Sequence, residues 1–125
     1  MKIEVSIGEV LDKVTILQIK LEKIKDEIRL EHVRHELNIL EHRLNEQQVV
    51  IPKDLLEELK QINLTLWETE DIIRHCEKEQ NFGEEFIKHA RLDAQLNDQR
   101  FLIKNKINIS AQSNIQEQKS YAGLY

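Results

Sequence analysis

Apolar residues in the first half of the chain recur at alternating steps of four and three. One set is Val10, Val14, Leu17, Leu21, Ile24 and Ile28, and a second is Leu30, Val33, Leu37, Leu40 and Leu44. This spacing is typical of a helix that packs along one seam. The seam steps sideways near residues 29–31, so we expect a kink or a change of packing partner there, within one long helix over about residues 7–47.

Start and stop signals delimit this helix and two more. Ser6 and Glu9 have the spacing of a capping box, in which Ser6 accepts from the Glu9 amide and the Glu9 side chain reaches back. Pro52 suits the start of a second helix over about residues 53–80. Gly83 is suited to a left-handed turn before a third helix over about residues 84–109. Residues 110–125 have no helical period.

Composition supports an all-α fold. The chain has 125 residues, the size of one domain, so we expect residues 1–125 to form a single helical domain. Only 3 Gly and 1 Pro are present, too few for the frequent turns of a sheet protein. The sequence therefore predicts an antiparallel three-helix arrangement with a long N-terminal helix and a non-helical C-terminal tail.

The length of the predicted first helix bears on the oligomeric state. At about 1.5 Å per residue it would span about 60 Å, whereas the other two helices would each span roughly 40 Å. Part of its apolar seam would then be left bare unless the helix bends or a second chain covers it. We therefore expect a homodimer, and a purely structural dimerisation adaptor is one functional hypothesis.

Charge and hydropathy exclude several classes of function. The net charge of −5 argues against nucleic-acid binding, which needs a basic face. The charge is uneven, because residues 86–125 carry six Lys and Arg against three Asp and Glu, which favours an anionic ligand there. No apolar run is long enough for a signal peptide or a membrane span, and the lone Cys76 forms no internal disulfide. We expect a cytoplasmic protein.

Polar side chains interrupt faces that should be buried. On the second helix, Asn63, Trp67, Glu70, Arg74 and Glu77 share one face. On the third, the row of seam spacing is Ile87, Ala90, Ala94, Asn97, Phe101, Lys104 and Asn108, with Arg91 and Asp98 beside it. Buried charges are tolerated when they are paired and hydrogen-bonded. The stripes therefore indicate either a network that fixes helix register or a pocket for a small anionic or polyhydroxy ligand.

Established catalytic patterns are scarce. The sequence suggests no Ser-His-Asp arrangement and no glycine-rich phosphate loop. Two of the five histidines, His32 and His35, are three residues apart, but no Glu-x-x-His spacing of a di-iron bundle accompanies them, and solvated helix faces explain them better. Glu68-x-x-Asp71 resembles the paired acidic residues of all-helical nucleotide pyrophosphohydrolases, which hold magnesium, and Asp98 is a further candidate for such a site. The partner Glu-x-x-Glu motif that such enzymes carry on another helix is missing. A magnesium-dependent phosphohydrolase stays an alternative, and we assign no catalytic residue, metal or cofactor.

Several sequence blocks together resemble an uncharacterised bacterial all-helical family, a domain of unknown function. They are Gly8-Glu9-x-Leu11-Asp12-Lys13, Leu66-Trp67-x-x-Glu70-Asp71-x-x-Arg74, Asn97-Asp98-x-Arg100 and Lys119-Ser120-Tyr121. The resemblance covers nearly the whole chain, although residues 25–60 match only in helical character. Ile7 stands where the family typically has proline. Family members resemble accessory proteins found in surface-polysaccharide contexts.

The family signature falls largely on the polar stripes. This coincidence predicts a small binding or accessory protein whose polar cluster between helices takes an anionic or sugar-like ligand. Because the signature includes the tail, we also expect the tail to be ordered and to fold back near the cluster. The predicted ligand-binding residues are Trp67, Glu70, Arg74, Arg91, Asn97, Asp98, Arg100, Lys104, Asn108, Lys119 and Tyr121.

Overall fold

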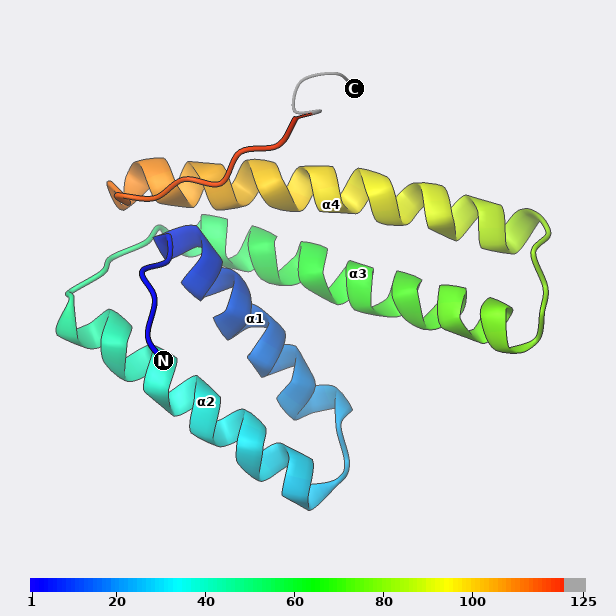
Figure 1. The fold of residues 1–125 in the computed structure, drawn as a ribbon, viewed down its shortest axis with the longest axis horizontal. Helices are drawn as coiled ribbons and strands as arrows, with labels where there is room; N and C mark the ends of the chain where they lie inside the picture. The colour runs from blue at the N-terminus through cyan, green and yellow to red at the C-terminus, as the bar shows by residue number, and fades with distance from the viewer. Residues whose placement is uncertain (121–125) are drawn as a thin grey trace.

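The computed structural model describes residues 1–120 and contains four helices and no strand in that range. They are α1 (Ile7–Lys23), α2 (Glu27–Glu46), α3 (Lys53–Lys78) and α4 (Glu84–Ser110) (Figure 1). The all-helical class is confirmed, and the bounds of the last two helices are close to those predicted. The expected three-helix arrangement is wrong, because residues 7–47 form two helices. None of the helices in residues 1–120 is long and apolar enough to cross a membrane.

The chain reverses direction at residues 24–26 instead of continuing as one long helix. Ile24 ends α1 with an extended backbone (φ −81°, ψ 136°). Asp26 then caps α2, since its Oδ1 accepts hydrogen bonds from the amides of Ile28 at 3.0 Å and Arg29 at 3.4 Å. A short carboxylate that satisfies the free amides of a helix start competes with helix continuation. The sideways step of the seam therefore marks a second helix with its own partner.

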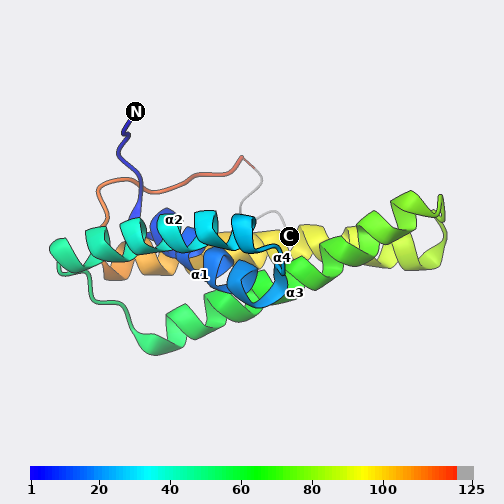
Figure 2. The ribbon, with the colours of Figure 1, turned by 90° about the horizontal axis from the view of Figure 1, so that it is seen from below.

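Helix α1 lies at the centre of the bundle and packs against each of the other three helices (Figures 1 and 2). Between α1 and α2 lies a core of Val14, Leu17, Val33 and Leu37. A second core joins α1 to α3 and α4 and consists of Leu11, Leu59, Ile103 and Ile107. Because α2 covers one side of α1 and the α3–α4 hairpin covers the other, α1 is buried on two faces.

The apolar seam that was expected to need a second chain is covered from within. Val33 and Leu37 of α2 are 7% and 8% exposed and pack on Val14 and Leu17 of α1. The long bare seam, which supported both the homodimer and the adaptor hypothesis, is therefore absent. Any dimer of this protein needs a different surface.

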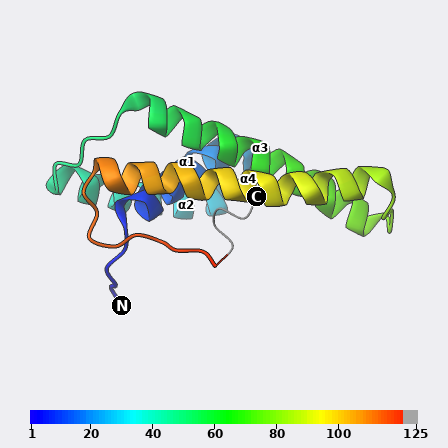
Figure 3. The ribbon, with the colours of Figure 1, turned by 90° about the horizontal axis from the view of Figure 1, so that it is seen from above.

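The α3–α4 hairpin is longer than the rest of the bundle. Helix α3 has 26 res and α4 has 27 res, against 17 res in α1. At a rise of about 1.5 Å per residue, the two long helices each span about 40 Å and α1 spans roughly 25 Å. The end of the hairpin near its connecting loop therefore extends beyond α1 and α2 (Figures 1 and 3). Side chains at that end have only the partner helix to pack against.

Three helices end in the same way, with a glutamine in the left-handed region. Gln48, Gln80 and Gln112 each have φ 54°, and the amide one residue further on bonds to a carbonyl five residues back. This is the geometry of a Schellman turn, in which glycine is the usual residue. Gly83, which we expected to be left-handed, has φ −81° and stands at the N-cap of α4.

Gly8 lets α1 approach α4 closely. Its amide donates to Asn108 Oδ1 at 2.6 Å. A Cβ at this position would lie 2.6 Å from the Lys104 carbonyl oxygen and 2.8 Å from Asn108 Oδ1. Backbone cannot yield as a flexible side chain can, so only glycine fits here without moving a helix.

We predict that Gly8→Ala lowers the free energy of unfolding by about 1–3 kcal/mol, the usual cost of overpacking. Gly83→Ala is the matched control, because a Cβ there meets nothing nearer than Asn81 Oδ1 at 3.3 Å. Urea unfolding followed by circular dichroism measures both. Equal stability of the two variants would contradict the close approach of α1 to α4.

Candidate functional site

A buried carboxylate, Asp12, joins three helices. Asp12 lies on α1 and is 1% exposed. Its Oδ1 accepts from Arg100 Nε of α4 at 2.8 Å and from Asn63 Nδ2 of α3 at 2.9 Å. Its Oδ2 accepts a further hydrogen bond from the same guanidinium. The two-pronged contact with Arg100 matches the planar fork of that side chain to the carboxylate, which is the strongest form of this pairing.

The position of Asp12 follows from a second buried row on α1. Gly8, Asp12, Thr15 and Ile19 are spaced by four, three and four residues and are all buried. The Thr15 hydroxyl donates to the Asp12 carbonyl at 2.8 Å and accepts from Asn63 Nδ2 at 2.8 Å. We call Asp12, Thr15, Asn63 and Arg100 the Asp12 cluster. Its hydrogen bonds connect residues up to 88 positions apart in the sequence.

The partners of Asp12 hold it in its charged form. Burial alone would raise the pKa of Asp12, but hydrogen bonds from Arg100 and then Asn63 outweigh burial and hold the pKa below its ordinary value. The hydrogen bonds to Asp12 in turn raise the pKa of Arg100. At neutral pH the two residues therefore form an ion pair whose carboxylate is buried and whose guanidinium is 28% exposed, and it stabilises the fold only while both partners are present.

Lys104, one turn after Arg100 on α4, is surrounded by carboxylates. Its side chain is 8% exposed, and its Nζ lies 2.8 Å from Glu9 Oε2, 3.2 Å from Glu117 Oε2 and 3.9 Å from Asp12 Oδ2. Burial lowers the pKa of Lys104, but these carboxylates, Glu9 foremost, raise it above its ordinary value. The expectation that the Glu9 side chain reaches back to cap its own helix is therefore not met, although Ser6 does accept from the Glu9 amide at 3.1 Å.

Beside Lys104 lies a small cleft between the start of α1, the middle of α4 and the chain after α4. Its volume is about 250 Å³. The polar cleft, as we call it, is lined by Glu9, Asn97, Arg100, Phe101, Lys104, Glu117 and Lys119. Lys119 Nζ lies 5.9 Å from the centre of the Phe101 ring and 3.6 Å from Glu117 Oε1. Three cations and two carboxylates thus face one confined space.

A line of polar contacts continues from Arg100 along the α3–α4 hairpin. Arg100 donates to Asn97 Oδ1 at 3.3 Å, and Asn97 Nδ2 donates to the Asp93 carbonyl at 3.0 Å. Burial, and then a hydrogen bond with Asp93, raise the pKa of Glu70, and Arg74 lies 3.9 Å from Glu70 at the far end. The predicted ligand-binding residues Arg100, Asn97, Glu70 and Arg74 therefore lie one after another along the hairpin and do not surround one pocket.

The structure separates the residues predicted to bind ligand. Asn97, Arg100, Lys104 and Lys119 line the polar cleft. Arg74, with a side chain 73% exposed, does not join them. It lies three helical turns beyond Asn63 on α3, about 16 Å along the helix axis. The others lie elsewhere: Arg91 is exposed, Trp67, Glu70 and Asp98 are half-buried outside the cleft, and Asn108 is buried under Gly8.

The tail, as far as it is described, contacts the bundle. Ser113 Oγ accepts from the Ile7 amide at 3.1 Å, and Glu117 pairs with Lys104. Tyr121, which was expected to bind ligand, lies outside the described residues, so an ordered tail over its whole length stays a prediction. The assignment of any of these residues to ligand binding also stays a prediction at this point.

The predicted ligand-binding residues left out the carboxylates of the site, which are Glu9, Asp12 and Glu117. Asp12 carried a detectable signal, because it continues the row of buried spacing from Gly8 to Thr15. Glu9 was assigned only to the helix cap, which accounts for its backbone amide but leaves its carboxylate free to bind elsewhere. Glu117 lies in an irregular segment, where no periodicity indicates which side chains face the bundle.

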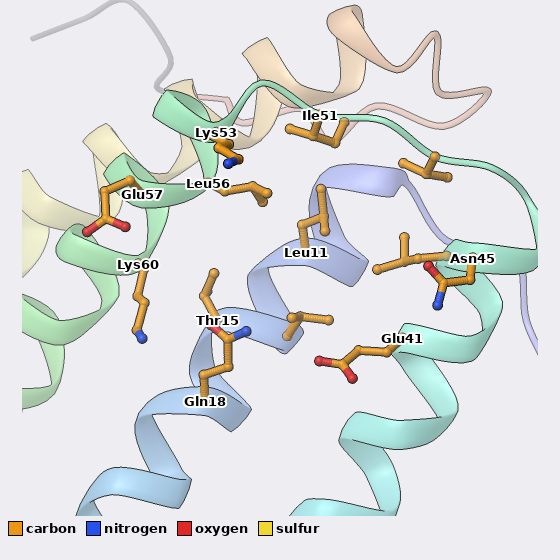
Figure 4. Close-up of a pocket in the computed structure, with 13 residues that line it drawn as sticks. Leu11, Thr15, Gln18, Glu41, Asn45, Ile51, Lys53, Leu56, Glu57 and Lys60 are labelled. Atoms are coloured by element: carbon orange, nitrogen blue, oxygen red, sulfur yellow. The ribbon is translucent and has the colours of Figure 1, made fainter.

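A larger pocket of about 570 Å³ opens on the other side of α1, between α1, the end of α2 and the start of α3 (Figure 4). Leu11 and Leu56 are among the apolar residues in its lining. Its rim carries Lys53 and Lys60 on α3 but also Glu41 on α2. Opposite charges on the rim favour neither anion nor cation, and no predicted site residue lies there. The polar cleft is therefore the better candidate site.

The acidic residues proposed for magnesium are not gathered. Glu68 and Asp71 are exposed on α3, and Asp98 is half-buried on α4. Within residues 1–120, no three His, Cys, Asp or Glu side chains are grouped as metal ligands would be. The phosphohydrolase alternative therefore gains no support from the arrangement of its side chains.

The fold and the site define a class of protein: an all-α protein with four helices in residues 1–120 and a charged cleft beside the Asp12 cluster. The chain belongs to the family of unknown function DUF6165, whose model matches residues 1–124. The match fits the expected membership of an uncharacterised family. No curated protein and no solved structure is similar enough to the chain to count as a match.

We predict that acid destabilises the protein partly through Asp12. Its pKa is lower in the folded than in the unfolded chain. The stability it contributes is therefore present above about pH 4 and is lost as pH falls through its folded pKa. Urea unfolding between about pH 5 and about pH 2.5 should show a steeper acid loss for the natural protein than for Asp12→Asn.

Glu70→Gln is the control with the opposite sign, because a raised pKa means that protonation of Glu70 favours the folded state. The free energy of unfolding of Glu70→Gln should fall in acid at least as steeply as that of the natural protein, unlike that of Asp12→Asn. A constant difference in stability between Asp12→Asn and the natural protein over the whole range would contradict a charged, buried Asp12.

Proposed function

We propose that this protein is a non-enzymatic binding module that takes a small anionic group in the polar cleft. The observation that carries the proposal is the position of Glu117. Its carboxylate lies 3.2 Å from the buried Lys104 ammonium, yet it belongs to the irregular segment after α4 and its side chain is 36% exposed. A carboxylate from a peripheral segment thus occupies the place that a ligand anion would take.

The size of the cleft limits the ligand. Pockets for whole small molecules usually measure about 300–1,000 Å³, and the polar cleft measures about 250 Å³. It therefore takes a head group, such as a phosphate or a carboxylate, with the rest of the molecule outside. A sugar phosphate or an acidic sugar fits this description, because the Asn97 amide and the Glu9 carboxylate at the cleft are suited to hydroxyl groups.

Two of the three cations of the cleft, Arg100 and Lys104, lie on α4 and are held in place by side chains of α1. Arg100 is fixed by Asp12, and Lys104 is fixed by Glu9 at 2.8 Å. The contacts with Asp12 and Glu9 also raise the pKa of Arg100 and of Lys104 respectively, so both cations stay charged at any physiological pH. An anion that enters meets donors already in place, which lowers the ordering cost of binding.

Exchange at Glu117 supplies the route of entry. Rotation of the Glu117 side chain exposes Lys104 without breaking any helix, since Glu117 lies outside α4. Once the carboxylate has left, Lys104 keeps Glu9 and Arg100 keeps Asp12, so three cations face two carboxylates and one positive charge is left over. This balance favours an anion over a cation or a neutral molecule.

The alternative is that these contacts only stabilise the fold. The two proposals assign different roles to Glu117. A structural Glu117 stabilises the protein and has no effect on ligands. A Glu117 that occupies the anion site competes with every anion that enters. Glu117→Gln therefore separates the two roles, because it removes the charge and keeps the shape of the side chain.

We predict that Glu117→Gln tightens the binding of inorganic phosphate about fivefold, the effect of removing one like charge worth roughly 1 kcal/mol near the surface. Lys104→Gln should abolish binding. The matched control is Lys106→Gln, which removes an exposed cation two residues away on α4 and should leave affinity unchanged. Calorimetric titration at constant ionic strength measures the affinities.

Circular dichroism of each variant shows whether it is folded, which matters most for Lys104→Gln because that change removes a buried cation from between Glu9 and Glu117. A panel of sugar phosphates and acidic sugars then ranks the ligands. Equal affinity of the natural protein and Glu117→Gln for every anion that binds would contradict the proposed site. So would the absence of binding across the panel in both proteins.

A further inference from the structure

The first five residues extend away from the helices. Residues 1–5 form no helix, and Figures 2 and 3 show this segment leaving the bundle at the start of α1. Its apolar side chains are unusually exposed for their size: Met1 is 118%, Ile3 73% and Val5 39% exposed. Three large apolar side chains on one protruding segment indicate a surface that a partner covers.

The segment alternates as a strand does. Met1, Ile3 and Val5 are apolar, whereas Lys2 and Glu4 are charged, so an extended backbone places the apolar side chains on one face and the charges on the other. Within residues 1–120, the backbone of this segment makes no hydrogen bond. Both of its edges therefore offer free amides and carbonyls, which pair readily with another strand.

We propose that residues 1–5 pair antiparallel with the same residues of a second copy of this chain, with the two-fold axis at Ile3. In this register Lys2 of each copy lies opposite Glu4 of the other, so both charged pairs are complementary. The apolar side chains of both copies share the opposite face, with Ile3 against Ile3 and Met1 against Val5. The proposal is independent of the ligand of the polar cleft.

The positions of the charged and apolar residues in the segment favour this register and a second copy of the same segment. A parallel pair would place Lys2 opposite Lys2 and Glu4 opposite Glu4, and like charges directly opposite are destabilising. An antiparallel shift by one residue puts charged residues on the apolar face. A shift by two residues places either Lys2 or Glu4 opposite itself. The centred antiparallel register alone pairs all five residues with opposite charges matched, which makes the segment self-complementary.

The bundle fixes the base of the segment. The Ile7 amide donates to Ser113 Oγ at 3.1 Å, and Ser6 accepts from the Glu9 amide at 3.1 Å. The Ser113 hydroxyl also donates to the Ile115 carbonyl at 2.8 Å, and the apolar Ile115 side chain is 41% exposed. The point at which the segment leaves the bundle is therefore fixed in the free protein.

The expected dimer is weak, because a two-stranded ribbon of five residues per strand has little surface to bury and such ribbons are marginal in water. Sedimentation velocity over a concentration series should show a reversible monomer–dimer equilibrium. Lys2→Glu should weaken dimerisation at least about tenfold, because it places Glu opposite Glu4 twice. Glu4→Lys should do the same by placing two lysines opposite each other.

The double variant Lys2→Glu/Glu4→Lys restores both opposite pairs and should recover the dimer to within about threefold of the natural protein. Lys13→Glu is the matched control: it makes the same charge change at an exposed position of α1 and should have no effect. These variants lie outside the helix cores, so all of them are expected to fold.

Cross-linking tests the register directly. Ile3→Cys should form a disulfide-linked dimer on oxidation, because directly opposite residues in an antiparallel pair have Cα atoms about 4.5–5.5 Å apart, within disulfide range. Lys2→Cys should not, since Lys2 faces Glu4 of the other copy. The natural Cys76 is buried and does not compete.

A protein that stays monomeric up to millimolar concentration would overturn the proposal. A dimer that responds equally to Lys2→Glu and Lys13→Glu would also overturn it, because the contact would then lie elsewhere. Equal cross-linking of Ile3→Cys and Lys2→Cys would reject the register and, with it, the charge argument on which the proposal depends.

Discussion

The rest of the structure depends on the charged Asp12 carboxylate inside the bundle. A buried carboxylate without partners costs several kcal/mol, so Asp12 is compatible with this fold only where Arg100 and Asn63 reach it. One lies on α4 and the other on α3, and Asp12 lies on α1. The requirement to satisfy one charge therefore sets how α1 sits on the α3–α4 hairpin. Gly8, one turn earlier, permits the same approach sterically.

This constraint divides the polar residues by role. Arg100 and Asn63 are committed to Asp12, and changing either removes a partner from a buried charge. Lys104 lies at the edge of the same network, and one of its partners, Glu117, comes from outside the helices. The two interpretations of the polar stripes thus apply to neighbouring residues: the interior part fixes the helices, and the edge is where we propose that a ligand anion exchanges with a side chain.

Local patterns of the sequence predicted much of the helical structure and little of its pairing. The bounds of α3 and α4 follow from apolar spacing and from Pro52, because both signals act over a few residues. The break after α1 was missed, since Ile24 and Ile28 continue the seam spacing across it while Asp26 ends the helix through its own hydrogen bonds. The contact between Asp12 and Arg100 spans 88 positions, and no periodicity encodes which distant side chain supplies the opposite charge.

On the α3–α4 hairpin, the presence or absence of α1 decides the pKa of a carboxyl between the two helices. Glu70 lies seven residues after Asn63 on α3, and Asp93 lies seven residues before Arg100 on the antiparallel α4. The polar pair of Asn63 and Arg100 is therefore followed, about two helical turns along the hairpin, by the polar pair of Glu70 and Asp93. At the first pair, α1 supplies Asp12, and the ion pair with Arg100 holds the pKa of that carboxyl low. At the second pair the helices supply two carboxyls, and the Arg74 side chain, which lies 3.9 Å from Glu70 Oε2, is exposed. Burial and Asp93 therefore raise the pKa of Glu70. The same repeat therefore holds a carboxyl in its charged form where α1 places Asp12 beside Arg100, and it raises the pKa of Glu70 where the described helices supply no buried cation.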